Sequence, residues 1–366
     1  MCIGGPGIGT FRACDQRAVG GRRGRSEPER AIDVHPGIMS TRKINSGTPW
    51  CRKPTCTYAA VALHWLQPMQ CARNPGRARR HDRPDDVSER EVMDHFLRPG
   101  LRFEVVDSGP PDAPAVVLLH GFPQQPSTFE AVAARLNAEG LRTLTPTQRG
   151  YIRTARPTRR RDYRTAATAG DVIALLDTAG LAKAHIVGHD WGGNQAWGAA
   201  SWHPDRVASL TVLSTPHPAA LFKALRTSKQ SLLSWYVGLF QLPALPEALA
   251  ARTLAKSLRD NGLPEEFANR YAAAMSEPGA LTGALNWYRG IPFSRRPPLG
   301  RITVPTTYIW GRNDVVLARA AVELTADHVA GPYEVVELDA GHWLPETEPD
   351  AVAAGILARV RSTTAS

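Results

Sequence analysis

Cysteine is missing from most of this chain, since all five cysteines lie within its first 71 residues. They form no paired C-x₂-C arrangement, and Cys51 and Cys56 with a solitary His64 match a zinc site poorly. Long apolar runs are lacking too, because the longest candidate, residues 58–66, is too short to cross a bilayer. The N-terminus has no continuous apolar segment of the secretory type. The sequence therefore predicts no metal site, no membrane span and no secretory signal.

Acidic residues are scarce near the N-terminus, where most of the net positive charge lies. Residues 1–90 hold 16 of the 44 Lys and Arg and 8 of the 34 Asp and Glu, which leaves a net charge of +2 for the remainder. Many Arg, Gly and Pro predict a basic, disordered extension over residues 1–92 without a defined role. A transit peptide, a nucleic-acid arm and an overlong reading frame that precedes Met93 are alternatives. We expect a cytoplasmic protein that binds no nucleic acid.

From residue 101 onward, strand-like and helix-like segments alternate. Strands are predicted over 102–106, 115–120, 142–145, 184–188, 207–213, 303–310 and 333–338, and helices over 163–178, 193–202 and 349–361. Crossovers of that length imply an α/β fold, with a mostly parallel sheet flanked by helices. An Ala- and Leu-rich helical segment, 217–298, interrupts the pattern after the predicted strand 207–213. We expect a core of residues 93–216 and 299–366 with a helical cap of residues 217–298.

The most informative segment is Gly188-His189-Asp190-Trp191-Gly192, which has the G-x-S-x-G outline of a nucleophile elbow with aspartate in place of serine. The turn between strand and helix is sharp, and its flanking positions must be small. A carboxylate in this position forms alkyl esters by displacement at saturated carbon, so a strained or activated C–X bond such as an epoxide or alkyl halide is the expected electrophile. The alternative is an ordinary turn in which Asp190 caps the next helix.

Three further segments place polar groups just beyond predicted strands. Residues 115–123 end in His120-Gly121-Phe122-Pro123, residues 306–314 end in Asp314, and residues 335–343 contain His342. Open α/β sheets carry their chemistry at the carboxyl ends of strands. Alone, Asp314 is explained as a turn residue and His342 as a surface histidine. Together, in the order Asp190, Asp314, His342, they predict a catalytic triad.

At this point the chain resembles the epoxide hydrolase branch of the α/β-hydrolase superfamily, from about Leu101 to about Val360. The shared motifs are His120-Gly121-Phe122-Pro123, Arg149-Gly150-Tyr151, Gly188-His189-Asp190-Trp191-Gly192-Gly193, Gly311-Arg312-Asn313-Asp314, Gly341-His342-Trp343 and, most specifically, Leu285-Asn286-Trp287-Tyr288-Arg289.

The resemblance places the helical cap after the sixth core strand and implies roles for its tyrosines. Tyr288 would donate a hydrogen bond or proton to the epoxide oxygen, and a buried aromatic that packs the cap is its alternative. The family's second tyrosine stands just before a Phe-Gln pair, where this chain has Leu239. Tyr236 lies three residues earlier, about one helical turn back, and is a candidate substitute.

The expected mechanism needs no cofactor and no metal. Asp190 attacks a small apolar epoxide, and His342, oriented by Asp314, activates the water that hydrolyses the ester. The backbone amides of Phe122 and Trp191 form the oxyanion hole. The predicted pocket residues are His120, Pro123, Trp235, Leu239, Phe240 and Trp343.

Two other functional classes stay open. A haloalkane or haloacetate dehalogenase would use the same triad, and Tyr288 in its Asn-Trp-Tyr-Arg setting is the better discriminator between the two activities. The third class is a binding protein on a hydrolase fold without turnover. A complete triad argues against it, because a receptor needs no base that activates water.

Overall fold

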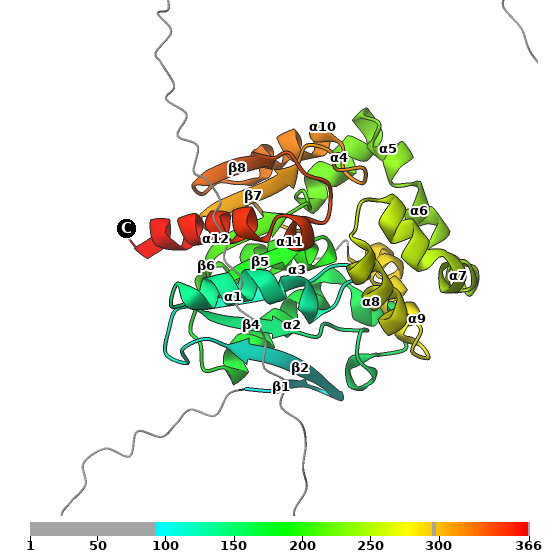
Figure 1. The fold of residues 1–366 in the computed structure, drawn as a ribbon. Coiled ribbons are helices and arrows are strands. Elements are labelled where there is room, and N and C mark those ends of the chain that lie inside the picture. The colour runs from blue at the N-terminus through cyan, green and yellow to red at the C-terminus, as the bar shows by residue number, and fades with distance from the viewer. Residues whose placement is uncertain (1–92, 295–297, 365–366) are drawn as a thin grey trace, which may run out of the picture. The chain divides into compact units, whose positions relative to one another are not determined.

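An eight-stranded sheet forms the centre of the computed structural model, which describes residues 93–294 and 298–364 (Figure 1). The predicted extension of residues 1–92 lies outside the described residues. The strands are β1 (His95–Arg98), β2 (Leu101–Ser108), β3 (Ala115–Leu119), β4 (Arg142–Pro146), β5 (Ala184–His189), β6 (Val207–Leu213), β7 (Thr306–Gly311) and β8 (Tyr333–Leu338). Their order in the sheet is β1, β2, β4, β3, β5, β6, β7, β8.

The strands from β3 to β8 pair in parallel, whereas β1 and β2 are antiparallel to their neighbours. Every residue of β3, β4, β5 and β7 is buried, as expected for parallel strands covered on both faces. The register pairs Leu119 with Gly188 and Gly188 with Val212. The loops after β3, β5 and β6 therefore leave the sheet at the same edge.

Helices cover both faces of the sheet. The main ones are α1 (Glu130–Ala138), α2 (Thr165–Thr178), α3 (Trp191–Trp202) and α12 (Pro349–Thr364), with the shorter α10 (Arg319–Glu323) and α11 (Leu344–Thr347) near the C-terminus. One apolar cluster joins Val117 of β3 to α2 and α3, and a second joins Val116 to α1 and α12. Because Val116 and Val117 are successive strand residues, their side chains enter opposite layers.

The segment between β6 and β7 consists of helices that lie together at one end of the sheet (Figure 1). They are α4 (Pro218–Thr227), α5 (Gln230–Leu233), α6 (Trp235–Leu239), α7 (Leu245–Asp260), α8 (Glu265–Met275) and α9 (Ala280–Arg289), followed by the 3₁₀ turn η5 (Ile291–Phe293). A third apolar cluster packs Trp287 and Tyr288 of α9 against Tyr151. The indole N–H of Trp287 also donates to the Arg149 carbonyl at 2.7 Å. We call residues 217–298 the cap segment.

The seven predicted strands occur within three residues of their expected bounds. The parallel sheet and its flanking helices are therefore confirmed. Two elements give too weak a sequence pattern to be predicted: β1 has only four residues, and α1 buries only Val132 and Leu136 among alanines and polar residues. Within residues 93–294 and 298–364, no helix combines the length and the apolar character that crossing a bilayer requires.

Candidate active site

Asp190 occupies the turn between β5 and α3 in a conformation that side chains rarely adopt, with φ 50° and ψ −122°. The backbone N–H of Asp190 donates to the Leu213 carbonyl at 3.2 Å, and the Thr215 hydroxyl donates to the Asp190 carbonyl at 2.8 Å. A Cβ at Gly192 would lie 2.0 Å from the Leu119 carbonyl oxygen. The glycine therefore lets the elbow approach β3.

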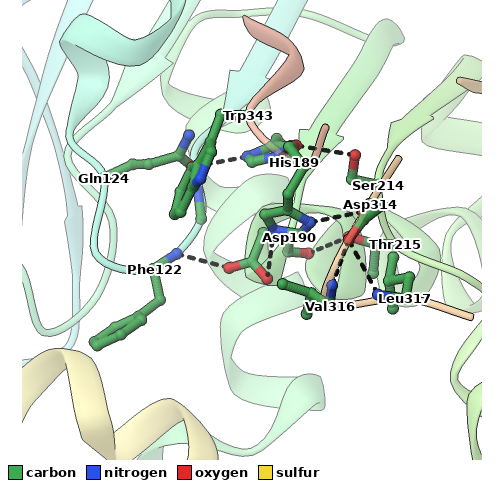
Figure 2. A network of polar contacts seen from close by, with 12 residues as sticks. Phe122, Gln124, His189, Asp190, Ser214, Thr215, Asp314, Val316, Leu317 and Trp343 are labelled. Carbon is green, nitrogen blue, oxygen red and sulfur yellow. Dashed lines mark hydrogen bonds and ion pairs between the residues drawn. The ribbon is translucent and has the colours of Figure 1, made fainter. Parts of the chain in front are cut away.

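The Asp190 carboxylate turns away from its own helix, and no hydrogen bond from it caps α3. Its Oδ1 instead accepts the Phe122 backbone N–H at 2.7 Å, a contact across the sheet edge (Figure 2). Its Oδ2 lies 3.8 Å from Nε2 of His342. Burial alone would raise the pKa of Asp190, but the hydrogen bond and charge of His342 lower it below the ordinary value. The carboxylate is thus held ionised.

His342 and Asp314 are joined by a hydrogen bond of 2.9 Å from Nδ1 to Oδ2. The other oxygen of Asp314 accepts the backbone N–H groups of Val316 and Leu317 at 2.7 and 3.0 Å (Figure 2). Although burial opposes protonation of the imidazole, Asp314 and Asp190 outweigh it and raise the pKa of His342 to about 10. This raised pKa favours an imidazole that carries protons on both ring nitrogens while Asp190 is charged.

A cavity of about 490 Å³ brings Asp190 and His342 together with the cap tyrosines Tyr236 and Tyr288. The rings of Tyr236 and Tyr288 are 6.0 Å apart, and Tyr288 also packs edge-on against Trp191. Burial raises the pKa of both phenols, so both stay protonated at neutral pH. The apolar wall is formed by Leu221, Phe222, Leu225, Val237, Ile291, Leu299, Val316 and Leu317.

Two negative charges, one buried imidazole and two phenols thus meet at the carboxyl ends of β5, β7 and β8. Such a site can offer a carboxylate to an electrophile, hydrogen bonds to a leaving oxygen and a base to water. Over residues 93–294 and 298–364, no group of three or more His, Cys, Asp or Glu side chains is arranged to hold a metal ion.

Comparison with known proteins gives the fold its family, because the family described as the α/β hydrolase fold matches residues 114–349. The chain belongs to the α/β hydrolases. It is 34% identical to the AB hydrolase superfamily protein YfhM of Bacillus subtilis over 265 residues, which cover 69% of this chain and 92% of the relative. It is 33% identical to human epoxide hydrolase 4 over 305 residues, which cover 78% of this chain and 83% of the relative.

A solved structure supports the same assignment. The crystal structure of epoxide hydrolase A from Mycobacterium thermoresistibile superposes with a TM-score of 0.65 and 29% sequence identity, covering 73% of this chain and 97% of that one. The resemblance that the motifs indicated is therefore confirmed. Within the α/β hydrolases, this chain is a member of the epoxide hydrolase family.

A buried polar network that the sequence does not predict joins Gln124, His189 and Glu346 to the loop of His342. Gln124 Oε1 accepts the Gly121 N–H at 2.7 Å and lies 2.8 Å from Nδ1 of His189, whose Nε2 is 2.9 Å from the His342 carbonyl (Figure 2). Gln124 Nε2 donates to Glu346 at 2.7 Å, and burial raises the pKa of Glu346 to about 7. The sequence signals for this network are that His189 lies inside the elbow motif and that Gln124 directly follows His120-Gly121-Phe122-Pro123.

None of the six predicted pocket residues is among those that line the cavity. In the cap segment, Trp235 is 67% exposed, whereas Tyr236 and Val237 face the cavity. Neighbouring helical residues point about 100° apart, so a one-residue step moves a side chain from cavity to solvent. Phe240 packs its ring against Phe122 and Tyr288 instead, and Leu239 is half-buried outside the cavity.

The three predicted pocket residues of the core are buried beneath the site. His120 accepts the Gln148 N–H through Nε2 at 3.3 Å and stacks beside Trp287. Trp343 donates its indole N–H to the Asn261 carbonyl of the cap segment at 3.0 Å, and Pro123 is buried with the loop after β3. Their places in the motifs are therefore explained by packing against neighbouring layers.

Proposed function

We propose that this chain is an epoxide hydrolase, which opens an epoxide to a vicinal diol through a covalent ester on Asp190. The observation that carries the proposal is one cavity lined by an ionised Asp190, His342 and the two phenols of Tyr236 and Tyr288. The names of the relatives support the same substrate class. The substrates would be a small apolar epoxide and water, with residues 217–298 acting as a cap on the core of residues 93–216 and 299–366.

In the first half-reaction, Oδ2 of Asp190 attacks one epoxide carbon and the C–O bond of the ring breaks. Tyr288, with Tyr236 as a second donor, hydrogen-bonds the oxygen and gives it a proton, which the phenol regains from solvent. Oδ1 keeps its hydrogen bond from the Phe122 amide and becomes the ester carbonyl oxygen. The product of this step is a hydroxyalkyl ester of Asp190.

In the second half-reaction, His342 serves as the base. Ester formation removes the negative charge of Asp190, so one of the two groups that raise the pKa of His342 disappears. The imidazole then loses its extra proton and takes one from water, while Asp314 holds the ring. Hydroxide adds to the ester carbonyl carbon, and the Phe122 and Trp191 amides hold the oxyanion on Oδ1. The bond from that carbon to Oδ2 then breaks, the leaving oxygen takes the proton from His342, and the diol leaves with Oδ2. The regenerated carboxyl group of Asp190 returns its proton to His342.

A single turnover in H₂¹⁸O with enzyme in excess tests this pathway. Because water attacks the ester carbonyl, ¹⁸O should enter the Asp190 carboxylate, and the first diol should contain no solvent oxygen. Peptide mass spectrometry of the segment around Asp190 measures the label. A diol that contains ¹⁸O, together with an unlabelled Asp190, would mean that water attacks the epoxide directly.

Dehalogenation is the competing activity, because Trp191 lines the cavity and an indole N–H is a suitable donor to halide. A pair of phenols near Asp190 favours an epoxide, since an alkoxide leaving group needs a proton and a halide does not. Diol formation from styrene oxide and stilbene oxide, against halide release from haloacetates and haloalkanes, separates these activities. A binding protein without turnover would give neither product.

A further inference from the structure

Large apolar side chains are exposed mainly on the cap segment. In the part of the chain that the structure describes, twelve large hydrophobic residues are exposed, and eight of them lie between residues 218 and 293. These eight are Phe222, Leu232, Trp235, Leu242, Leu245, Leu249, Ile291 and Phe293. Single exposed apolar residues need no explanation, but a concentration on one segment marks an interaction surface.

Part of this apolar surface forms the rim of the cavity. Phe222 and Ile291 line the cavity and are also 51% and 39% exposed, so they stand where it opens to solvent. Leu232 and Trp235, which are 74% and 67% exposed, belong to α5 and α6. Because α4, α5 and α6 all contribute residues to the cavity wall, these exposed side chains belong to the helices that enclose the cavity.

The same helices carry positive charge and no acidic residue of their own. Residues 218–246 contain no Asp or Glu, whereas Lys223, Arg226 and Lys229 are all exposed. Lys223 has one exposed partner, Asp327, at 3.5 Å, which is too weak a contact to neutralise the surface. The guanidinium of Arg226 lies 4.7 Å from the ring of Phe222, so charge and apolar surface are in direct contact.

A second group of cations borders the opening from the core. Arg160 and Arg161 of the turn η3 (Arg160–Tyr163) and the adjacent Arg164 are exposed and precede Thr165, which lines the cavity. Arg160 reaches the Gln241 carbonyl, beyond the end of α6, at 3.5 Å. We call the exposed side chains of α4, α5, α6 and η3 the mouth face, because each of these elements contributes to the cavity wall or lies close in sequence to a residue that does.

We propose that the mouth face docks on an anionic lipid surface, from which the cavity takes apolar epoxides directly. Exposed Trp, Phe and Leu interspersed with Lys and Arg are typical of helices that lie at a lipid interface. Each cation near an anionic leaflet adds to the attraction, and the effect is screened by salt. The delivery of substrate rests on the proposed function, whereas the docking does not.

Charge decides against two other occupants. A second copy that used the same face would bring Lys223, Arg226 and Lys229 against their own counterparts, which repel. Residues 1–90 are also a poor cover, because they carry 16 Lys and Arg against 8 Asp and Glu. An anionic surface complements the charge of the mouth face. An acidic protein is the alternative partner, which the experiments below distinguish from lipid.

The docking is tested by cosedimentation of the full chain with vesicles. We expect binding to vesicles of phosphatidylserine and phosphatidylcholine in equal amounts, little binding to phosphatidylcholine alone, and weaker binding as salt is added. The double variant L232S/W235S should lower binding. Its control is L97S/V106S, which removes side chains that are 62% and 58% exposed on β1 and β2.

The charge contribution has its own pair of variants. Lys229→Glu should weaken binding to the anionic vesicles at least about fivefold, since a cation near the lipid becomes an anion. Lys183→Glu makes the same change in the exposed residue before β5, at the edge of the sheet opposite the site, and should leave binding unchanged. Equal losses in both variants, equal binding to both vesicle types or no vesicle binding would overturn the proposal. Binding to polyaspartate without vesicle binding would overturn it in favour of an acidic protein.

Two further arms separate docking from catalysis. Asp190→Asn should bind vesicles as the unaltered chain does, so docking remains measurable even if no epoxide is hydrolysed. With an active chain, L232S/W235S should lose turnover of an epoxide dissolved in anionic vesicles and keep turnover of a water-dissolved epoxide. A chain that hydrolyses no epoxide yet binds vesicles would refute the proposed function alone. Loss of turnover on both substrates would count against delivery from the lipid.

Discussion

The loops at the carboxyl ends of the core strands and the cap segment hold their side chains in different ways. In the core, Asp314 has a completely buried side chain whose two oxygens accept three hydrogen bonds. In the cap segment, Tyr288 is held by aromatic rings, including those of Phe122 and Trp191. The charged groups of the site thus come from loops at the carboxyl ends of the core strands. Its neutral hydrogen-bond donors come from the packed aromatic side chains of the cap segment.

The outer surfaces of the core and of the cap segment also differ in how many large apolar side chains they expose. The cap segment exposes eight of the twelve large apolar residues that are exposed in the described part of the chain, although it is the smaller region. Charge must be fixed to within fractions of an ångström for catalysis, whereas substrate entry needs an apolar and adaptable surface. On the proposed function, the core supplies the charged groups of the reaction, whereas the cap segment supplies neutral hydrogen-bond donors and selects the substrate.

The largest effect is expected from the core base. His342→Gln should lower steady-state diol formation by about 10² to 10⁴, because the ester forms but no base activates water. Intact-protein mass spectrometry should then show an adduct with the mass of the epoxide. Asp190→Asn is the matched control and should show no adduct. Lost turnover in His342→Gln without any adduct would remove the ester from the mechanism.

A somewhat smaller loss is expected from the cap donors. Tyr288→Phe should slow ester formation by about 10² to 10³, since the developing alkoxide loses a donor in a water-poor cavity. Stopped-flow tryptophan fluorescence under single-turnover conditions measures this step, and Tyr236→Phe should add to the loss in the double variant. Tyr163→Phe is the control, because the Tyr163 hydroxyl is bonded to the Pro157 carbonyl. An unchanged rate in the double variant would show that the core acts without the cap.

Sequence reasoning succeeded where local pattern and topology agree. Buried apolar runs such as 115–119 and 184–189 predicted the strands, and the meeting of parallel strand ends predicted that Asp190, Asp314 and His342 lie together. It failed where a contact spans the chain. Gln124 and Glu346 are 222 positions apart, and no local period relates them.

The six predicted pocket residues do not line the cavity, for a related reason. Proximity to a motif in sequence is a poor guide to proximity to the cavity, since Trp235 is exposed while its neighbour Tyr236 lines the cavity. Which face of a short helix turns inward is decided by tertiary packing rather than by composition. The sequence therefore specifies the charged half of the site better than its apolar half.

The hydrogen bond between Tyr271 of the cap segment and Glu346 of the core should make the free energy of unfolding depend on pH. The Tyr271 hydroxyl of α8 donates to Glu346 at 2.9 Å, and burial raises the pKa of Glu346 from 4.5 to about 7. A raised pKa in the folded state contributes stability that is fully present below pH 4.5 and is lost as the pH rises through 7, in total about 3 kcal/mol. Glu346→Gln should therefore gain stability relative to the unaltered chain over that interval.

Urea unfolding between pH 4 and pH 8 measures the difference in unfolding free energy between the two chains, in which the other titrating groups cancel. Glu348→Gln changes a half-buried carboxylate two positions away and is the matched control. A difference for Glu346→Gln that stays constant across this range would mean that the residue does not change its charge there. The contact between cap segment and core would then be independent of pH.

The smallest effect separates two neighbours in α6. Val237 lines the cavity and Trp235 does not, so Val237→Ala removes wall surface and Trp235→Ala removes only exposed surface. With a water-dissolved epoxide, Val237→Ala should raise KM by roughly tenfold or less, the equivalent of about two buried methyl groups. Trp235→Ala should leave kcat and KM within about twofold, as is usual for surface substitutions. If Trp235→Ala has the larger effect on this substrate, the exposed side of α6 takes part in the pocket after all. The division between a selecting interior and a docking exterior would then fail.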